Sequence, residues 1–353
     1  MKKNLMALSL TELEAFVVEI GLKAYRAKQI AAWIYQKYTG NIDEMTDISL
    51  SDRRNLLEKA KLQHLKIVKH QKSNDGTEKL LLELEDGNQI ESVLIPEERR
   101  LTLCISTQAG CTLDCTFCRT AEEKLKRNLM FDEIINQILT AQKISLGRRI
   151  THIVMMGMGE PLANLPAVTE ALQRITSPLF LGISQRKVTI STAGLVPQIH
   201  AFMNGPASAN LSISLNATTD AIRDQIMPKV NKLYPLPVLL SALKKIPLPS
   251  REKITFEYVL LRDVNDTLED AKRLIRITHG IRCKINLIPF NEFPESRFRR
   301  PYDQSILKFQ EVLKKGGLTA TVRKNRGMDI LAACGQLRGD QPRYRSPAPA
   351  CVS

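Results

Sequence analysis

From residue 101 onward, short runs of β-branched and other apolar residues alternate with segments whose apolar residues recur every three to four positions. Six of these runs are predicted to be strands, at residues 101–106, 152–156, 187–191, 210–215, 254–261 and 285–290. Strands that alternate with helices are typical of βαβ units, which build a parallel sheet. Six repeats are too few for a complete eight-stranded barrel, so we expect an α/β fold with an incomplete (βα)6 barrel.

The residues before this region predict a small helical domain followed by a hairpin. Ser9 and Glu12 form a capping-box pattern before a helix that ends near Gly21, and two further helices are expected at 25–38 and 56–62. Asp86-Gly87 separates the β-prone runs 79–84 and 90–95, which is typical of a β-hairpin. The interpretation divides the chain into a helical accessory domain (1–64), a β-hairpin linker (65–98), the partial barrel with a basic C-terminal segment (99–340) and a flexible tail (341–353).

Charge indicates a polyanionic partner. The chain has 51 Lys and Arg against 37 Asp and Glu, a net charge of +14, and residues 293–345 contribute half of that excess. The basic helices of the accessory domain are explained either by RNA contact or by a small core with a solvated charged face. A composition of 43% apolar and 25% charged residues excludes disordered and fibrous classes.

Neither a membrane span nor a signal peptide is predicted. The longest apolar stretches are well below the length that a transmembrane helix needs. The N-terminal apolar segment is short and is followed at once by Glu12 and Glu14, which a signal peptide would lack. We therefore expect a cytoplasmic protein without a membrane partner.

Three of the seven cysteines, Cys111, Cys115 and Cys118, lie within eight residues. An odd number of cysteines without a leader argues against a disulfide framework, and thiolates are soft ligands for zinc or iron–sulfur clusters. Three ligands and one open position suit a cluster whose fourth iron binds a small molecule. A zinc site completed by Cys104 or a distant cysteine is the alternative, whereas a ferredoxin-type carrier lacks its fourth cysteine in this run.

Polar motifs follow the ends of the predicted strands. Gly159-Glu160-Pro161 follows the second strand, Ser191 ends the third, Ser214-Leu215-Asn216 ends the fourth, and Asn291 follows the sixth. Glycines let the backbone approach a ligand, and a carboxylate such as that of Glu160 can receive an ammonium group. Because ligands bind at the carboxyl ends of parallel strands, these motifs are expected on one rim together with the cysteines.

The cysteine spacing and the Gly-Glu-Pro motif together resemble the radical S-adenosylmethionine (SAM) superfamily. Further strings narrow the resemblance: Arg26-Ala27-Lys28-Gln29, Arg127-Asn128-Leu129, and Ala332-Ala333-Cys334-Gly335-Gln336-Leu337. They are similar to the RlmN/Cfr family of RNA adenine methyltransferases, and within it to the dual-specificity RlmN branch. The resemblance covers about residues 20–340.

The resemblance implies the cofactors and the site residues. A 4Fe–4S cluster is expected on Cys111, Cys115 and Cys118, and the matching positions for SAM contact are Gly159, Glu160, Ser191, Ser214, Leu215, Asn216 and Asn291. Cys334 matches the cysteine that is itself methylated, Cys104 its partner in a transient disulfide, and Glu91 the proton acceptor.

The resemblance also implies the reaction and the partners. The expected substrates are an adenosine of 23S rRNA in the peptidyl-transferase centre and an adenosine of tRNA next to the anticodon, each methylated at C2 with two SAM molecules. C2 of adenine is electron-poor and is no nucleophile toward a methylsulfonium, so the family uses a radical route through methylated Cys334. An electron donor such as flavodoxin or ferredoxin is implied, and a monomer is expected.

Two departures and three alternatives accompany this interpretation. Residues 119–125 differ from the family's usual cluster loop, and Asn216 stands where a His is common. The alternatives are a C8-methylating sibling, a radical SAM activase with a non-RNA substrate, and a zinc-stabilised RNA-binding module. Glu160-Pro161 and the basic tail favour C2 methylation over C8. Cys283 and Cys351 have no matching role.

Overall fold

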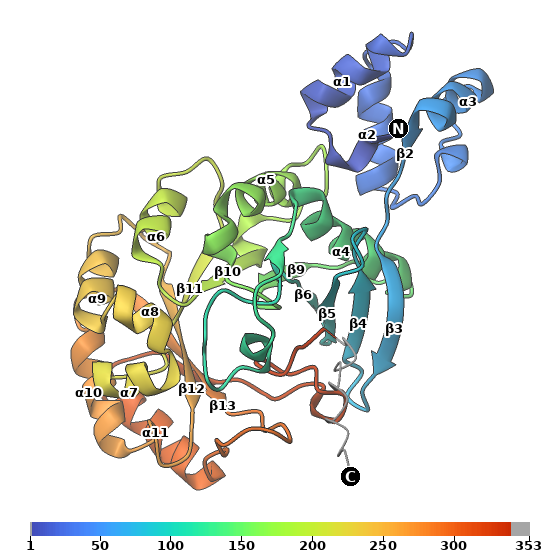
Figure 1. Cartoon of the computed structure of the whole chain (residues 1–353). Coiled ribbons are helices and arrows are strands. Elements are labelled where there is room, and N and C mark those ends of the chain that lie inside the picture. Colours follow the sequence, from blue (N-terminus) through green and yellow to red (C-terminus); the bar gives the residue numbers. More distant parts are fainter. Residues whose placement is uncertain (1, 340–353) are drawn as a thin grey trace, which may run out of the picture.

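The computed structural model describes residues 2–339 and is built around one ten-stranded sheet (Figure 1). The strand order is β14-β13-β12-β11-β10-β9-β6-β5-β4-β3. From one edge to the other, the strands are Ala320–Val322 (β14), Cys283–Pro289 (β13), Ile254–Leu260 (β12), Asn210–Ser214 (β11), Val188–Thr192 (β10), His152–Met155 (β9), Leu101–Cys104 (β6), Gln89–Pro96 (β5), Glu78–Glu83 (β4) and Lys66–Lys72 (β3).

The six strands predicted after residue 101 are confirmed, and they pair in parallel in the order β6 to β13. Helices occupy the outer side of the curving sheet, as a partial barrel requires (Figure 1). These helices are Phe131–Ile144 (α4), Leu165–Thr176 (α5), Val196–Met203 (α6), Asp220–Ile226 (α7), Pro228–Leu233 (α8), Leu236–Lys244 (α9), Leu268–Thr278 (α10) and Asp303–Lys315 (α11). Strand β14 was not predicted, because three residues are too short a run to show a pattern.

The predicted hairpin is confirmed as β4 and β5, which pair antiparallel across Asp86-Gly87. Gly87 has φ +80°, the left-handed conformation that such a turn requires. Strand β3 pairs with β4 and was not predicted. Because β5 also pairs with β6, residues 66–96 extend the sheet of the barrel. The division into four parts stays a prediction, and its tail, 341–353, lies outside the described residues.

The N-terminal helices are Leu10–Glu19 (α1), Arg26–Tyr35 (α2) and Leu50–Lys59 (α3). The capping box at Ser9 and Glu12 is confirmed. The helix expected at 56–62 is wrong at both ends. It begins at Leu50 because the Ser49 side chain accepts the N–H of Asp52, and residues 60–61 (β2) instead pair with Lys3–Asn4 (β1).

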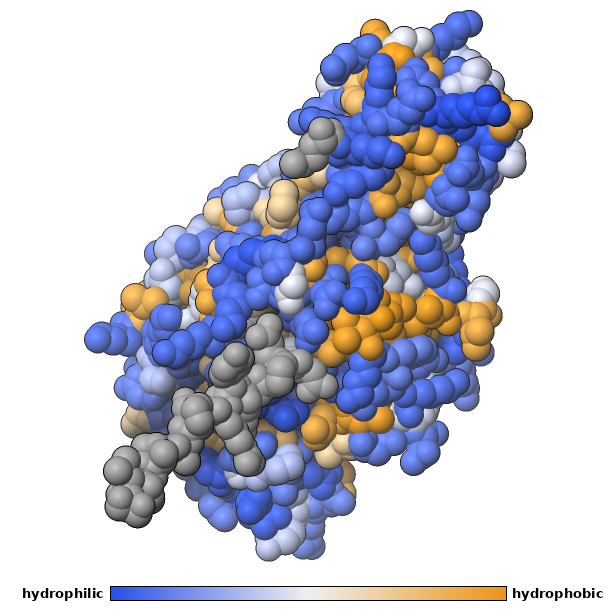
Figure 2. Space-filling view, turned by 45° about the vertical axis from the view of Figure 1, so that its right-hand side comes forward, coloured by the Kyte–Doolittle hydropathy of each residue, from blue (hydrophilic) through white to orange (hydrophobic). Residues whose placement is uncertain are grey.

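These helices form a lobe that projects from the larger body (Figure 2). The face of the molecule seen in this view is mainly hydrophilic. Arg174 of α5 fastens the lobe: its guanidinium is buried, donates to the Tyr35 hydroxyl at 3.0 Å and to the Met6 carbonyl at 3.3 Å, and lies 4.2 Å from the Phe131 ring centroid. No helix among residues 2–339 is long and apolar enough to cross a membrane.

Candidate active site

A pocket of about 160 Å³ lies at the carboxyl ends of the parallel strands, where the motifs were expected. It collects all but three of the predicted site residues: Cys111, Cys115, Cys118, Gly159, Glu160, Ser191, Ser214, Asn216, Asn291 and Cys334. The predicted residues that do not line it are Glu91, Cys104 and Leu215, and the Leu215 side chain is fully buried. The sequence motifs therefore meet at one rim of the sheet.

The three clustered cysteines lie on the loop after β6. The N–H of Cys118 donates to the Cys115 carbonyl at 2.9 Å, and the N–H of Leu113 donates to the Cys111 sulfur at 3.4 Å. The N–H of Thr116 donates to the Ile226 carbonyl at 3.0 Å, which ties the loop to the end of α7. These bonds hold all three thiols toward the pocket.

The three thiols suit a metal centre with one open position. Burial raises the pKa of Cys111 to about 12, so its thiol needs a bound metal before it becomes a thiolate. Each cysteine of a 4Fe–4S cluster ligates a separate iron, so three cysteines that face one pocket would hold the cluster and leave its fourth iron open to a ligand.

The loop after β9 needs its two glycines. A Cβ on Gly157 would lie 2.7 Å from the Ile105 carbonyl oxygen. Gly159 has φ +102°, and a Cβ there would lie 2.6 Å from Cβ of Gln108. This close approach holds the next residue, Glu160, against the pocket, because the Glu160 N–H donates to the Gln108 side chain at 2.9 Å.

Glu160 is a buried carboxylate that faces the pocket. It accepts N–H groups from Ala193 at 2.8 Å and from Leu162 at 3.1 Å. Burial nevertheless raises its pKa to about 7, since these two bonds only partly offset the loss of water. No cation of the described residues pairs with it at ion-pair distance, so a ligand with an ammonium group would complete it.

The rim continues with Ser191, Ser214 and Asn216. The two serine oxygens are 3.5 Å apart, and both line the pocket. Asn216 has φ +57°, and its Oδ1 accepts the N–H of Val259 at 2.9 Å. Asn and His are both enriched in this left-handed conformation, so Asn can occupy the position where the family commonly has His.

The segment that carries Cys334 is tied to the cluster loop. The Asn291 side chain donates to the Cys334 carbonyl at 3.0 Å, and the N–H of Arg119 donates to the Gly335 carbonyl at 2.7 Å. Arg338 makes ion pairs with Glu123 at 2.9 Å and with Glu122 at 3.2 Å. The part of the loop that departs from the family pattern is therefore the part that holds the Cys334 segment in place.

Cys104 and Glu91 belong to two paired strands, β6 and β5. Cys104 ends β6 and is buried, and burial followed by the proximity of Cys334 raises its pKa to about 12. Glu91 of β5 is buried, forms an ion pair with Lys79 at 2.9 Å and accepts the N–H of Arg338 at 2.6 Å. The two thiols are thus within electrostatic reach of each other, and Glu91 anchors the residues that follow Cys334.

Two further charged residues line the pocket, and neither was among the predicted site residues: Glu257 and Arg323. Glu257 accepts hydrogen bonds from Ser212 at 2.8 Å and from Asn286 at 2.6 Å. The pKa of Arg323 is raised, chiefly because Cys334 is near. A lone carboxylate inside the apolar strand β12 was the available signal for Glu257. Arg323 follows β14, which was not predicted, so its position carried no such signal.

Substituting Arg338 by methionine tests the tie between the loop and the Cys334 segment. Methionine keeps much of the length but removes both ion pairs, so we expect the methylation of Cys334 that the family resemblance implies to slow by about tenfold in a single turnover, with iron content unchanged. Mass spectrometry of the protein measures this step. Arg297→Met, an exposed arginine of the same basic segment, is the control. Equal rates in both variants would show that the tie is dispensable.

Comparison with known proteins places this site in a family. Residues 3–62 match the ribosomal RNA large subunit methyltransferase N-terminal domain, and residues 105–277 match the radical SAM superfamily. A solved radical SAM methyltransferase from Sphaerobacter thermophilus is similar at TM-score 0.91 and 38% identity, covering 96% of this chain and 100% of that one.

Curated relatives extend over nearly the whole chain. The dual-specificity RNA methyltransferase RlmN of Geobacter sulfurreducens is 49% identical over 336 residues, which are 95% of this chain and 92% of that protein. The protein of the same name from Geotalea uraniireducens is 48% identical, with 96% and 97% covered. With the cluster loop, the glycine–glutamate loop and Cys334 in one pocket, this chain belongs to the RlmN family of RNA methyltransferases, radical SAM enzymes that use a 4Fe–4S cluster and SAM.

Proposed function

We propose that this enzyme methylates C2 of an adenosine in 23S rRNA and C2 of the adenosine next to the anticodon in tRNA, through a methylated Cys334. One observation carries the proposal: Cys334 lines the same pocket as Cys111, Cys115 and Cys118, although more than 200 residues separate it from them. A thiol held beside a cluster site has a use when the substrate carbon cannot attack a methylsulfonium itself. An activase does not explain that placement. A zinc site completed by Cys334 would, but the match of residues 105–277 to the radical SAM superfamily favours the iron–sulfur cluster.

In this proposal, one set of side chains binds the cluster and another binds SAM. Cys111, Cys115 and Cys118 hold the cluster, and Glu160 receives the ammonium group of SAM, with Ser191, Ser214, Asn216 and Asn291 along the same wall. Together, cluster and SAM supply one-electron chemistry that can take a hydrogen atom from a methyl group. The polar wall orients the ligand, and the apolar residues of the pocket exclude water from it.

Cys334 acts as the methyl carrier: its sulfur accepts a methyl group, and the carbon it carries is then joined to C2. Release requires a second thiol: the Cys104 thiolate is proposed to attack the Cys334 sulfur, so that an S–S bond forms as the bond to the product carbon breaks. That carbon takes up a proton to become the methyl group, and the one electron that the reductant supplied leaves the adduct. Glu91 is proposed to take the C2 proton. Electrostatic coupling between the two thiols supports the Cys104 role, and the hydrogen bond of Glu91 to Arg338 supports its proximity.

Nucleoside mass spectrometry tests the proposal and separates it from its closest alternative. Anaerobically reconstituted enzyme with rRNA and tRNA fragments is expected to form 2-methyladenosine in both. Formation of 8-methyladenosine instead would assign the chain to C8 chemistry. No methylation of either RNA, with SAM cleavage stimulated by a protein or metabolite, would favour the activase.

The remaining partners are proposals on the same basis. A one-electron reductant such as flavodoxin or ferredoxin is expected to feed the cluster. Since rRNA and tRNA are the substrates, we propose that the enzyme works in the cytoplasm, and that it acts as a monomer because one chain provides every residue of the pocket.

Substituting Glu160 by glutamine tests the ammonium contact. Glutamine keeps the shape and can still accept the Ala193 N–H, but it removes the charge, so we expect SAM affinity to fall about 10- to 100-fold. Equilibrium dialysis with SAM measures the effect, with iron content as a check. Glu311→Gln, an exposed residue of α11, is the control. Unchanged affinity in the Glu160 variant would remove this residue from the SAM site.

A further inference from the structure

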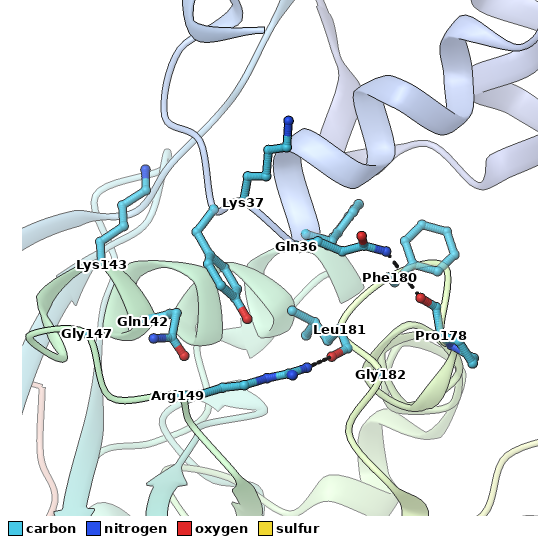
Figure 3. Close-up of a pocket in the computed structure, with 12 residues that line it drawn as sticks. Gln36, Lys37, Gln142, Lys143, Gly147, Arg149, Pro178, Phe180, Leu181 and Gly182 are labelled. Carbon is cyan, nitrogen blue, oxygen red and sulfur yellow. Dashed lines mark hydrogen bonds between the residues drawn. The ribbon is translucent and has the colours of Figure 1, made fainter. Parts of the chain in front are cut away.

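A second cavity, of about 710 Å³, lies between the N-terminal lobe and the barrel (Figure 3). The residues after α2 form one wall, the end of α4 and the turn after it form another, and the loop 178–182 after α5 closes it. The Gln36 side chain donates to the Pro178 carbonyl at 3.2 Å across this junction. Both parts of the protein therefore build the cavity, which we call the junction cleft.

The junction cleft is positively charged. Lys37, Lys143 and Arg149 line it, and no Asp or Glu is among its lining residues in the described chain. In Figure 3, Lys37 and Lys143 extend toward the same side, while Arg149 lies across the cleft below them. The Lys37 ammonium lies over the Trp33 ring, 3.4 Å from its centroid, so Lys143 and Arg149 are the cations that remain to attract an anionic ligand.

These cations retain donors for a ligand. Arg149 donates to the Leu181 carbonyl at 3.0 Å and makes no other hydrogen bond among the described residues. Lys143 forms no ion pair within residues 2–339, and burial lowers its pKa, an effect that Glu44 partly opposes. Glu44 itself is hydrogen-bonded to Thr39. An incoming phosphate would compensate Lys143 and use the open side of the guanidinium.

The cleft lies at the opposite end of the sheet from the catalytic pocket. Residues 142–149 precede β9, and residues 178–182 precede β10, so both segments lie at the amino ends of the strands. The catalytic motifs follow the carboxyl ends of the same strands. Strands of four to five residues separate the two sites by roughly 15 Å, at about 3.3 Å per residue. The ligand of the cleft is therefore not the adenosine that is methylated.

Exposed cations continue from the cleft along this end of the sheet. They lie in the segments just before β6, β9, β10, β12 and β13, whereas no such cation precedes β11. We call them the basic strip: Arg99, Arg148, Arg186, Lys187, Arg251 and Arg282. Glu97, Glu98 and Glu252 lie among them, and Glu97 pairs with Arg100. None of the six forms an ion pair within residues 2–339, so no acidic side chain neutralises their charge. Arg148 and Arg282 each donate to backbone carbonyls.

We propose that the junction cleft and the basic strip bind the sugar–phosphate backbone of the RNA substrate, away from the methylated adenosine. This inference rests on the proposed function for the identity of the polyanion. A free phosphate or nucleotide would need cations that converge on one point, whereas these are spread along an edge, as successive phosphates are. Contacts of this kind position the substrate and add affinity without reading its sequence.

A double variant, Lys143→Gln with Arg149→Gln, tests the inference in the holoenzyme. The matched control is Lys308→Gln with Lys314→Gln, two exposed lysines of α11 that remove the same charge. Fluorescence anisotropy with labelled full-length tRNA and with its isolated anticodon stem-loop, at several salt concentrations, measures binding. The path around the barrel is longer than the roughly 15 Å through the sheet, so we expect full-length tRNA, but not the short stem-loop, to reach the cleft while its anticodon loop occupies the catalytic pocket.

For full-length tRNA, we expect the double variant to lose about 5- to 20-fold in affinity. The slope of log affinity against log salt should fall by about 1.5, because two phosphate contacts are lost. In turnover assays KM should rise with kcat unchanged. Binding of the stem-loop and the melting midpoint should match the control variant.

Three results would overturn the inference. They are affinity for full-length tRNA equal to that of the control variant, an equal loss of affinity for both RNAs, and a loss of AMP or inorganic phosphate binding with tRNA affinity unchanged. The last would make the cleft a site for free phosphate compounds. Because anisotropy does not depend on methylation, an enzyme that methylates neither RNA but shows the length-dependent loss would refute the proposed function and leave this inference standing.

Discussion

Replacing Cys334 by alanine is expected to abolish RNA methylation while leaving the cluster site intact. Cys334 lines the pocket, and the proposed route needs its sulfur as methyl carrier, so the rate should fall by at least about 10³-fold. No methylated protein should be found by mass spectrometry. Iron and sulfide content should match the wild type, because the backbone ties of this segment run through Asn291 and Arg119 and do not involve the sulfur.

Cys283→Ala is the control, since Cys283 is another free thiol, buried where Cys334 is partly exposed, and it lies at the amino end of β13, away from the pocket. It is expected to retain methylation, with at most a small loss of stability from the lost sulfur. Purified Cys334→Ala enzyme that still forms 2-methyladenosine would contradict the methyl-carrier mechanism. Direct transfer from SAM would then have to be considered.

Replacing any one of Cys111, Cys115 or Cys118 by alanine is expected to remove the cluster. Two thiolates cannot hold a cluster that needs three, so iron, sulfide and the brown absorbance should all be lost. SAM cleavage and RNA methylation should fall below detection together, in contrast to Cys334→Ala, which loses methylation alone. Metal analysis, visible absorbance and deoxyadenosine formation measure the three effects.

The same Cys283→Ala variant controls for the loss of a buried thiol. Wild-type enzyme that binds zinc, with no iron or sulfide after anaerobic reconstitution, would support the alternative interpretation as a zinc-stabilised RNA-binding module. A cysteine variant that keeps full SAM cleavage would show that its sulfur is not a ligand. Because the three sulfurs face one pocket on one short loop, the three variants should behave alike.

Much of the fold could be predicted from local patterns. All six barrel strands and the hairpin around Asp86-Gly87 have a period or a turn signal within a few residues. Strand β14, three residues long, has no such signal, and β3 is a mostly exposed edge strand without alternation. The start of α3 at Leu50 was missed because the five residues after Leu50 are polar and show no apolar periodicity. Only the cap at Ser49 marks where the helix begins.

The candidate site was predictable in part for the same reason. The cysteine spacing and the glycine–glutamate loop are local, and each follows a strand, so parallel topology places them on one rim. Glu257 and Arg323 were not among the predicted site residues. A strand carboxylate has an ordinary surface explanation, and the sequence marked Arg323 only as part of the basic C-terminal segment. The roles of Cys104 and Glu91 came from family resemblance, and they stay predictions.

By itself, the sequence determined which chemistry is available: soft sulfur ligands at fixed spacing, glycines that admit a ligand, a carboxylate for a cation, and strand–helix alternation. Tertiary structure alone decided which distant residues meet. It brought Cys334 to the cluster loop and placed Lys143 and Arg149 in one cleft with residues of the N-terminal lobe. The physical reason is that periodicity and turn chemistry act over a few residues, whereas contacts across hundreds of residues depend on how complete layers pack.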